Sequence, residues 1–152
     1  MTSAESSALT PGHLKALGWL KAGPRRMLIG GKWVDAISGK TFETINPATE
    51  EKLTTVAQAD SADVDAAAVA ARRAFENPAW SAISPHARTR LLLRIADAVE
   101  QHADELAVLE TLDGGTLLSA SCGRVAGVAE TFRYYAGWPT KILALLTLSS
   151  GA

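Results

Sequence analysis

Residues 85–112 predict a helix that is apolar on more than one side, and this pattern limits the folds open to the chain. Three consecutive leucines, Leu91–Leu93, spread over about 200° of a helix that turns about 100° per residue. The main apolar stripe consists of Leu92, Ile95, Ala96, Val99, Ala103, Leu106 and Leu109 or Leu112. Such a helix has to be covered from several sides. Because the rest of the chain predicts only a small sheet and two other helices, we expect missing partner elements.

A shorter helix is predicted over 62–76. Ser61 is a suitable N-cap, and Asp63 lies near the positively polarised end of the helix. Apolar residues follow at spacings typical of a helix, at Val64, Ala68, Ala71 and Phe75. Asn77-Pro78 ends this helix, and Ser84-Pro85 begins the next one with an N-cap residue and a proline at the first helical position.

A third helix is predicted over 119–136. Gly137 ends it, with Pro139 just beyond. Its apolar face consists of Val125, Val128, Ala129, Phe132 and Tyr135. This face also exceeds what the small sheet and the other two helices can cover, which again indicates partner elements outside the chain.

Four short strands precede these helices. They are expected over 27–29, 32–36, 41–45 and 52–57. Turn residues separate them, namely Gly30-Gly31, Ser38-Gly39 and Asn46-Pro47-Ala48-Thr49. Because each connection is short, we predict one antiparallel β-meander.

Residues 1–26 are expected to be a flexible N-terminal extension. Small and turn-forming residues are frequent there, and Leu14, Leu17 and Leu20 predict at most a short amphipathic turn or two. The stretch lacks the continuous apolar core of a secretory signal. Its serines, its single acid at Glu5 and the pair Arg25-Arg26 leave a weak transit peptide as an alternative.

The composition is that of a globular domain with a balanced charge. The 152 residues include 15 basic and 16 acidic side chains, a formal net charge of −1, which argues against nucleic acid as a partner. The longest apolar run covers seven residues, 142–148, and a bilayer-spanning helix needs about 20, so no membrane association is expected. One cysteine cannot form an internal disulfide, and we expect a cytoplasmic location.

Three stretches of the sequence resemble the N-terminal part of the NAD(P)-dependent aldehyde dehydrogenase superfamily. They are MLIGGKWVDAISGKTFETINPATEE, then DVDAAAVAARRAFENPAWSAISPHARTRLLLRIADAVEQHADELAVLETLDGGTLL, and finally ETFRYYAGWPTKI. Together they cover residues 27–142, in the order and spacing of the family. The resemblance implies an α/β fold with a Rossmann-like cofactor domain, of which this chain holds only the N-terminal antiparallel β-meander and three helices. Residues 27–142 would then be the N-terminal part of the cofactor-binding domain, and the helices would pack on a parallel sheet supplied by later sequence.

The resemblance also implies a chemistry, NAD(P)-dependent oxidation of an aldehyde to a carboxylic acid. A cysteine thiolate attacks the aldehyde, the thiohemiacetal passes a hydride to NAD or NADP, and a glutamate activates water to hydrolyse the thioester. The family's asparagine, glycine and nucleophile motifs have no counterpart in this sequence. We therefore expect no catalytic residue and no cofactor-binding residue here, and no cofactor bound by this chain alone. Full-length members are expected to be homo-oligomers.

One binding role is implied by the resemblance, at an incomplete monovalent cation site. Thr44 and Ile45 match the strand end whose backbone carbonyls hold the cation, and Asp113 matches the acid after the long helix. Hard cations prefer such oxygen ligands. The alternative interpretation is that Asp113 simply opens the Gly114-Gly115 turn.

Other reactive side chains have structural interpretations. Cys122 is the only thiol, but it lacks the family's nucleophile motif and is interpreted as structural, with a reactive thiol as the alternative. His13, His86 and His102 have no spacing that brings two onto one helical turn, so exposed histidines are expected. The tryptophans and tyrosines are interpreted as packing residues.

The sequence departs from the family pattern at two local positions and in one long segment. Glu50 stands where the family has glycine, Thr116 stands where it has lysine, and residues 143–152 form an uncharged tail that resembles no part of the family. We therefore expect a truncated aldehyde dehydrogenase that is inactive alone, with a frameshift or premature stop before the tail. The alternative is a non-catalytic interaction module that packs against a full-length relative or another partner.

Overall fold

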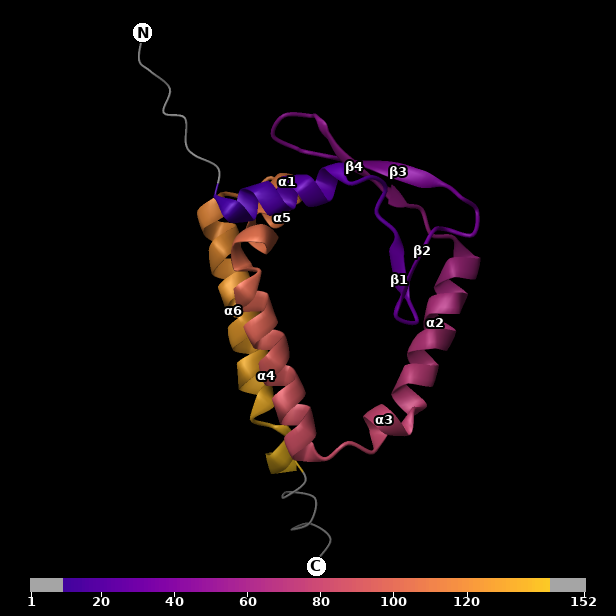
Figure 1. Cartoon of the computed structure of the whole chain (residues 1–152), viewed down its shortest axis with the longest axis vertical. Coiled ribbons are helices and arrows are strands. Elements are labelled where there is room, and N and C mark those ends of the chain that lie inside the picture. The colour runs from indigo at the N-terminus through magenta and orange to yellow at the C-terminus, as the bar shows by residue number, and fades with distance from the viewer. Residues whose placement is uncertain (1–9, 143–152) are drawn as a thin grey trace, which may run out of the picture.

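Six helices and four strands make up residues 10–142, the part of the chain that the computed structural model describes. Figure 1 shows them arranged around an open ring, with α4 beside α6, α1 beside α5, and the hairpins and α2 on the opposite side. The tail over 143–152 lies outside the described residues. In chain order the elements are α1 (Pro11–Lys21), β1 (Met27–Ile29), β2 (Lys32–Val34), β3 (Thr41–Ile45), β4 (Lys52–Ala57), α2 (Ser61–Glu76), α3 (Pro78–Ser81), α4 (Pro85–Gln101), α5 (Ala103–Gly114) and α6 (Leu118–Ala136).

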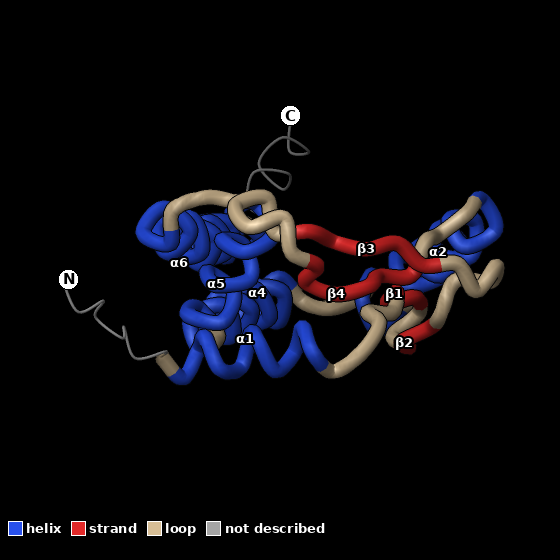
Figure 2. Tube along the Cα trace, turned by 90° about the horizontal axis from the view of Figure 1, so that it is seen from above, coloured by secondary structure: helices blue, strands red, loops and turns tan. Residues whose placement is uncertain are grey.

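The four strands form two separate antiparallel hairpins, so the predicted single meander is wrong. Three strands have the predicted bounds, and β2 ends two residues earlier than predicted, at Val34. The connection between β2 and β3 explains the separation, because the N–H of Ile37 bonds Asp63 of α2 at 3.0 Å. Arg25 joins the second hairpin on its other side. Its N–H donates to the carbonyl of Thr55 at 2.7 Å, and its carbonyl accepts the N–H of Ala57 at 2.8 Å. Arg25, two residues before β1, therefore pairs with the edge of β4 that faces away from β3. The two hairpins lie between the group α1, α4, α5 and α6 and the helix α2 (Figure 2).

The turn between β1 and β2 is fixed by its two glycines. Gly30 and Gly31 have φ of 60° and 77°, and a two-residue type I′ hairpin turn requires positive φ at both central positions. The second hairpin has a bulge between Thr44 and Ile45. Its turn ends at Glu50, which has a φ of 58°, in the left-handed region that favours glycine. The structure thus gives a physical reason for the glycine that the family pattern has at this position.

Helix α1 differs from the flexible extension predicted over 1–26. Thr10 caps the helix by accepting the N–H of His13 at 3.3 Å, and Pro11 occupies the first turn. Ala16 is completely buried, and a Cβ atom added to Gly12 would overlap Asp104 of α5. Packing against α5 buries one side of α1, and the local sequence pattern did not predict this contact. Residues 1–9 lie outside the described part of the chain.

Helix α2 begins one residue earlier than predicted because Asp60, and not Ser61, is its N-cap. The carboxylate of Asp60 accepts backbone N–H groups of the first turn, and Asp63 accepts the N–H of Asp60 at 3.0 Å, which completes a capping box. The other oxygen of Asp63 accepts the N–H of Ile37 at 3.0 Å. Asp63 is only 2% exposed, and these bonds satisfy its buried carboxylate. The β2–β3 connection is thereby fixed to α2.

The single helix predicted over 85–112 is two helices, α4 and α5, that meet at His102. His102 leaves the helical region with φ of −109° and ψ of 15°. Asp104 and Glu105 lie in the first turn of α5, where negative charge is favourable. The change of direction lets α5 lie beside α1 while α4 runs beside α6 (Figure 1).

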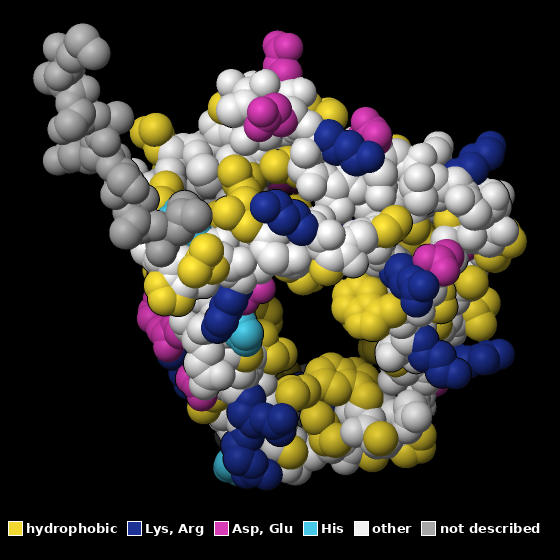
Figure 3. Space-filling model, turned by 45° about the horizontal axis from the view of Figure 1, so that its top comes forward, with side chains coloured by type: hydrophobic (Ala, Val, Ile, Leu, Met, Phe, Trp, Pro, Cys, Tyr) yellow, Lys and Arg dark blue, Asp and Glu magenta, His cyan; other side chains and the backbone are white. Residues whose placement is uncertain are grey.

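Helix α6 confirms the predicted third helix and ends at Gly137, as expected. Its buried stripe packs against α4 and α5 and consists of Ser121, Val125, Ala129 and Ala136. Val128, expected on the same face, is 45% exposed, and Phe75 of α2 is 64% exposed. Figure 3 shows hydrophobic side chains around the opening of the ring. The expected surplus of apolar helix surface is therefore present within residues 10–142.

Within those residues, no helix is long and apolar enough to cross a membrane.

We predict that Gly115→Ala destabilises the chain by about 2–3 kcal/mol. Gly115 caps α5 with a φ of 66°, and a Cβ atom there would stand 2.6 Å from Cγ of Pro47. Urea unfolding followed by circular dichroism measures the change. The control is Gly123→Ala inside α6, where no atom lies within 4 Å of the added Cβ, and a gain of about 0.5–1 kcal/mol is expected. A loss smaller than that gain would contradict the prediction.

Glu50→Gly is expected to stabilise the chain by about 0.5–1 kcal/mol, because it removes a left-handed non-glycine residue. The matched change at the next residue, Glu51→Gly, is expected to destabilise by a similar amount, since the β4 side of the turn needs no positive φ. Thermal unfolding of the two variants in parallel tests this difference in sign. Equal effects of the two glycines would refute it.

Candidate functional site

The predicted cation ligands lie at the end of β3 and at the end of α5. Thr44 and Asp113 line one cavity of about 420 Å³, bordered by α1, β3, β4 and α5. Ile45 does not line this cavity and pairs with Lys52 across the hairpin. The fold thus brings two of the three residues to one place, although they are far apart in the sequence.

The charges at the end of α5 favour a cation. Asp113 lies in the last turn of α5, where the helix carbonyls carry partial negative charge. No basic residue occupies that turn. Glu110, one turn earlier, also lines the cavity and pairs with Arg124 of α6 at 3.1 Å. The alternative was that Asp113 opens a turn made by Gly114 and Gly115. In the structure Gly114 is the last residue of α5, and only Gly115 takes the left-handed conformation.

Arg25 lies on the other side of the same cavity, and its side chain bonds the backbone. Its Nε and Nη2 donate to the carbonyl of Gly23 at 2.9 and 2.6 Å, and its guanidinium lies 4.5 Å from the centre of the Trp19 ring. Sequence reasoning missed this arrangement, since it assigned both residues to a flexible extension. The Arg25-Arg26 pair, which begins six residues after Trp19, is the local signal that could have indicated it.

Ser121 is a buried polar residue that the sequence did not single out. It is fully buried, accepts the hydroxyl of Thr111 at 2.9 Å and shares a hydrogen bond with the hydroxyl of Thr116 at 2.8 Å. Ser121 lies four residues before Val125, on the buried stripe of α6. This spacing is the sequence signal that could have indicated its burial. Both neighbours are hydroxyls, and within residues 10–142 no base bonds Ser121, so the cluster joins α5 to α6 and does not activate a nucleophile.

Cys122, the next residue, is a free thiol on the exposed side of α6.

Two of the three histidines have local partners: His13 bonds the Thr10 hydroxyl at 2.7 Å, and His102 contacts Glu105 at 3.1 Å. Among residues 10–142, no group of three or more His, Cys, Asp and Glu side chains is arranged to hold a metal ion. A cation site at Thr44 and Asp113 would depend instead on carbonyl oxygens.

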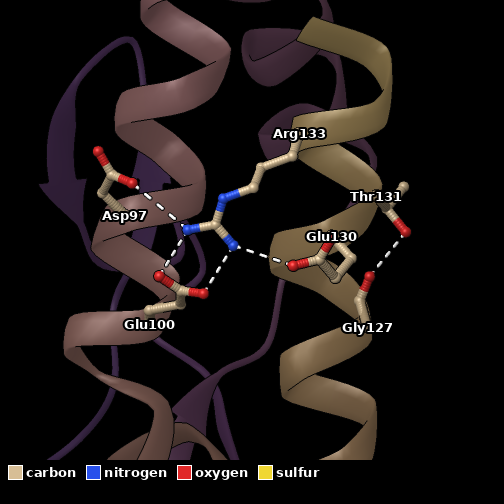
Figure 4. A network of polar contacts seen from close by, with 6 residues as sticks. All are labelled: Asp97, Glu100, Gly127, Glu130, Thr131 and Arg133. Atoms are coloured by element: carbon tan, nitrogen blue, oxygen red, sulfur yellow. Dashed lines mark hydrogen bonds and ion pairs between the residues drawn. The ribbon is translucent and has the colours of Figure 1, made fainter.

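Arg133 of α6 lies among three carboxylates (Figure 4). It bonds both oxygens of Glu100 at 2.6 and 2.5 Å and contacts Glu130 and Asp97 at 3.2 and 3.5 Å. The hydrogen bond from Arg133 lowers the pKa of Glu100, and the bond to Glu100 raises the pKa of Arg133. The lowered pKa means that this link between α4 and α6 is present at neutral pH and is lost as the pH falls and Glu100 becomes protonated.

Comparisons with known proteins identify the family. Residues 33–150 match the aldehyde dehydrogenase family. Aldehyde dehydrogenase 1 of Tanacetum cinerariifolium is 49% identical over 127 residues, which are 82% of this chain and 26% of that protein. The phenylacetaldehyde dehydrogenase of Pseudomonas fluorescens is 49% identical over 120 residues, 78% of this chain and 24% of that protein.

Solved structures agree with this assignment. The aldehyde dehydrogenase from Bacillus cereus, in its NAD+ complex, superposes with a TM-score of 0.79 and 43% identity over 88% of this chain and 27% of that chain. HpcC from Thermus thermophilus superposes with a TM-score of 0.77 and 42% identity over 82% of this chain and 24% of that chain. The fold that the resemblance implied is therefore confirmed.

The chain spans about a quarter of the length of these relatives. The family match ends at residue 150, eight residues into the segment that the sequence analysis assigned to a separate tail, so the start of that tail stays a prediction. The residues that match the family, 33–150, are most of the chain. The chain therefore belongs to the aldehyde dehydrogenase family.

Proposed function

We propose that this chain is the N-terminal part of the cofactor-binding domain of an NAD(P)-dependent aldehyde dehydrogenase and does not catalyse aldehyde oxidation by itself. The observation that carries the proposal is the superposition of 88% of the chain on 27% of the Bacillus cereus enzyme. The family's oxidation of an aldehyde to a carboxylic acid through a cysteine thiohemiacetal needs a nucleophilic thiol and a glutamate base. Neither family motif occurs in this sequence.

The only thiol of the chain supports this interpretation. Cys122 lies on the exposed side of α6, next to the buried Ser121 that joins α5 to α6. A reactive thiol needs a positively charged neighbour that stabilises the thiolate. The nearest basic residue in the sequence, Arg124, is engaged with Glu110 at 3.1 Å. We therefore assign Cys122 no part in the reaction.

The contribution of this chain to the enzyme is structural. The pair α4 and α6 buries small side chains between its helices and leaves larger apolar side chains, such as Val128, exposed. Exposed apolar surface of this extent stabilises a protein only when another element covers it. We propose that these faces pack on the sheet of the complete cofactor domain, in a cytoplasmic, homo-oligomeric enzyme that uses NAD or NADP. NAD+ is bound by the Bacillus cereus relative.

A chimaera tests the proposal. Residues 27–142 of this chain replace the corresponding segment of the Bacillus cereus aldehyde dehydrogenase, and the absorbance of the reduced nicotinamide measures turnover. We expect the chimaera to oxidise aldehydes with NAD+ and the isolated chain to show no turnover. A chimaera that folds as a native-like enzyme without any turnover would contradict the proposal, as would turnover by the isolated chain.

Two neighbouring residues provide matched variants within the chimaera. Cys122→Ala changes an exposed side chain and is expected to leave turnover within about twofold of the parent, whereas Ser121→Leu overfills a fully buried position and costs about 1–3 kcal/mol of stability. Loss of activity in Cys122→Ala with an unchanged melting temperature would instead assign the thiol a catalytic role.

The interaction module is the second candidate, favoured by the same exposed apolar faces. It differs in what the isolated chain does in solution. A module forms a stoichiometric complex with a separate partner chain, whereas a part of a larger domain forms none, because only the rest of that domain covers its apolar faces.

We further propose that Thr44, Ile45 and Asp113 form an incomplete monovalent cation site. The shared cavity of Thr44 and Asp113 supports it, as does the negative end of α5 next to the Asp113 carboxylate. The backbone carbonyls of Thr44 and Ile45 and the Asp113 carboxylate would be the ligands, and the cation would neutralise the negative charge at the helix end.

Replacing tetramethylammonium by potassium at constant ionic strength is expected to raise the unfolding midpoint of the chain. Asp113→Asn should abolish this potassium effect. In the absence of potassium it should stabilise the chain by a few tenths of a kcal/mol to about 1 kcal/mol, since it removes a negative charge from the helix C-terminus. Asp104→Asn, at the opposite end of α5, is the control and should destabilise while keeping any potassium effect. A potassium effect that survives Asp113→Asn would refute the site.

A further inference from the structure

A second recess lies between the end of α1 and the β1–β2 hairpin. It has a volume of about 600 Å³ and is lined by Trp19, Pro24, Arg25, Arg26 and Trp33. Small-molecule sites commonly have volumes of about 300–1,000 Å³. Four of the five lining residues precede residue 33, where the family match begins.

The segment that forms the recess is basic, although the whole chain carries a net charge of −1. Residues 10–34 contain no acidic residue, and their basic residues are Lys15, Lys21, Arg25, Arg26 and Lys32. The nearest acid in the sequence is Asp35, whose carboxylate lies 3.0 Å from Nε of Arg26. Arg26 thus has a carboxylate partner. The side chain of Arg25 bonds the backbone carbonyl of Gly23 and, among residues 10–142, pairs with no carboxylate. An excess of positive charge faces the recess.

The two tryptophans play different parts. The face of Trp19 is covered by the Arg25 guanidinium, 4.5 Å from the ring centre. Trp33 stands on β2 and is 64% exposed, and within residues 10–142 no aromatic ring or cation stacks on it. An indole face next to two guanidinium groups attracts a planar ring that carries a negative charge, because stacking and ion pairing act together.

We propose that this recess binds a small planar aromatic anion, an aryl carboxylate or aryl phosphate. The ring of the ligand stacks on Trp33, and the anionic group bonds the guanidinium of Arg26 with support from Arg25. The carboxylate of Asp35 competes with the ligand for Arg26. The size of the recess and the single uncovered indole favour one small ligand over a nucleic acid strand, which needs several stacking platforms along a groove.

Phenyl phosphate is the probe, with phenol and inorganic phosphate as the two half-probes. The four tryptophan indole N–H signals of the isotopically labelled full chain are followed by NMR during titration. Phenyl phosphate is expected to shift the signals of Trp19 and Trp33 saturably and to leave those of Trp80 and Trp138 unchanged. Phenol and inorganic phosphate should each bind at least about tenfold more weakly, because each lacks one of the two interactions.

Three variants separate the roles of the lining residues. Arg26→Gln is expected to weaken phenyl phosphate binding about tenfold, as the loss of one charge-assisted hydrogen bond predicts. Asp35→Asn removes the competing carboxylate and should strengthen binding. Trp33→Leu should weaken phenyl phosphate and phenol but not inorganic phosphate. Trp80→Leu, on the short helix α3, is the control and should change nothing.

Two results would overturn the proposal. One is equal binding of phenyl phosphate and phenol, which would mean apolar contact alone. The other is weaker binding in Asp35→Asn, which would mean that the Arg26–Asp35 pair only maintains the local structure. The signals of Trp80 and Trp138 report in each sample whether the chain is folded, so a failure of the aldehyde dehydrogenase chimaera does not affect this test.

Discussion

The close packing of α4 against α6 is the contact on which the rest of the structure depends. Ala96 and Ala129 are almost completely buried, so the two helices approach through small side chains. Arg133 and Glu100 join their exposed edges. Helix α5 is then fixed to α6 through the Ser121 hydroxyl cluster, and α1 packs on α5. Because small side chains bury little apolar area, this core is thin, and much of the apolar surface of the helices stays uncovered.

Local sequence signals predicted the parts of the fold that depend on local interactions. The strands were found from turn residues such as Gly30-Gly31, whose positive φ values the structure confirms. The end of α6 followed in the same way from Gly137. The predictions were wrong where contacts between residues far apart in the sequence determine the structure. Helix α1 is buried by α5, and the break at His102 lets α5 follow α1. The β2–β3 connection bonds Asp63 of α2, and β2 does not pair with β3.

The same distinction applies to the candidate sites. Asp113 and Thr44 came from family resemblance, and the structure places both on one cavity, although local pattern gives no reason for their proximity. The recess between α1 and the β1–β2 hairpin was not predicted, because its residues come from α1, the following loop and β2. Nothing in their spacing indicates that these elements meet. Asp63 was predicted only to favour the helix end, yet it also bonds Ile37 of the preceding connection.

The contact of Gly12 with Asp104 has a consequence for the order in which the chain folds. It joins Gly12 and Asp104, which are 92 positions apart in the sequence, whereas hairpins and neighbouring helices form contacts between nearby residues. Closing so long a loop costs conformational entropy that only the final packing offsets, so local elements form first and this contact forms late. During synthesis α1 leaves the ribosome long before α5 exists. Until then its apolar side remains available to other molecules, including those that assist folding.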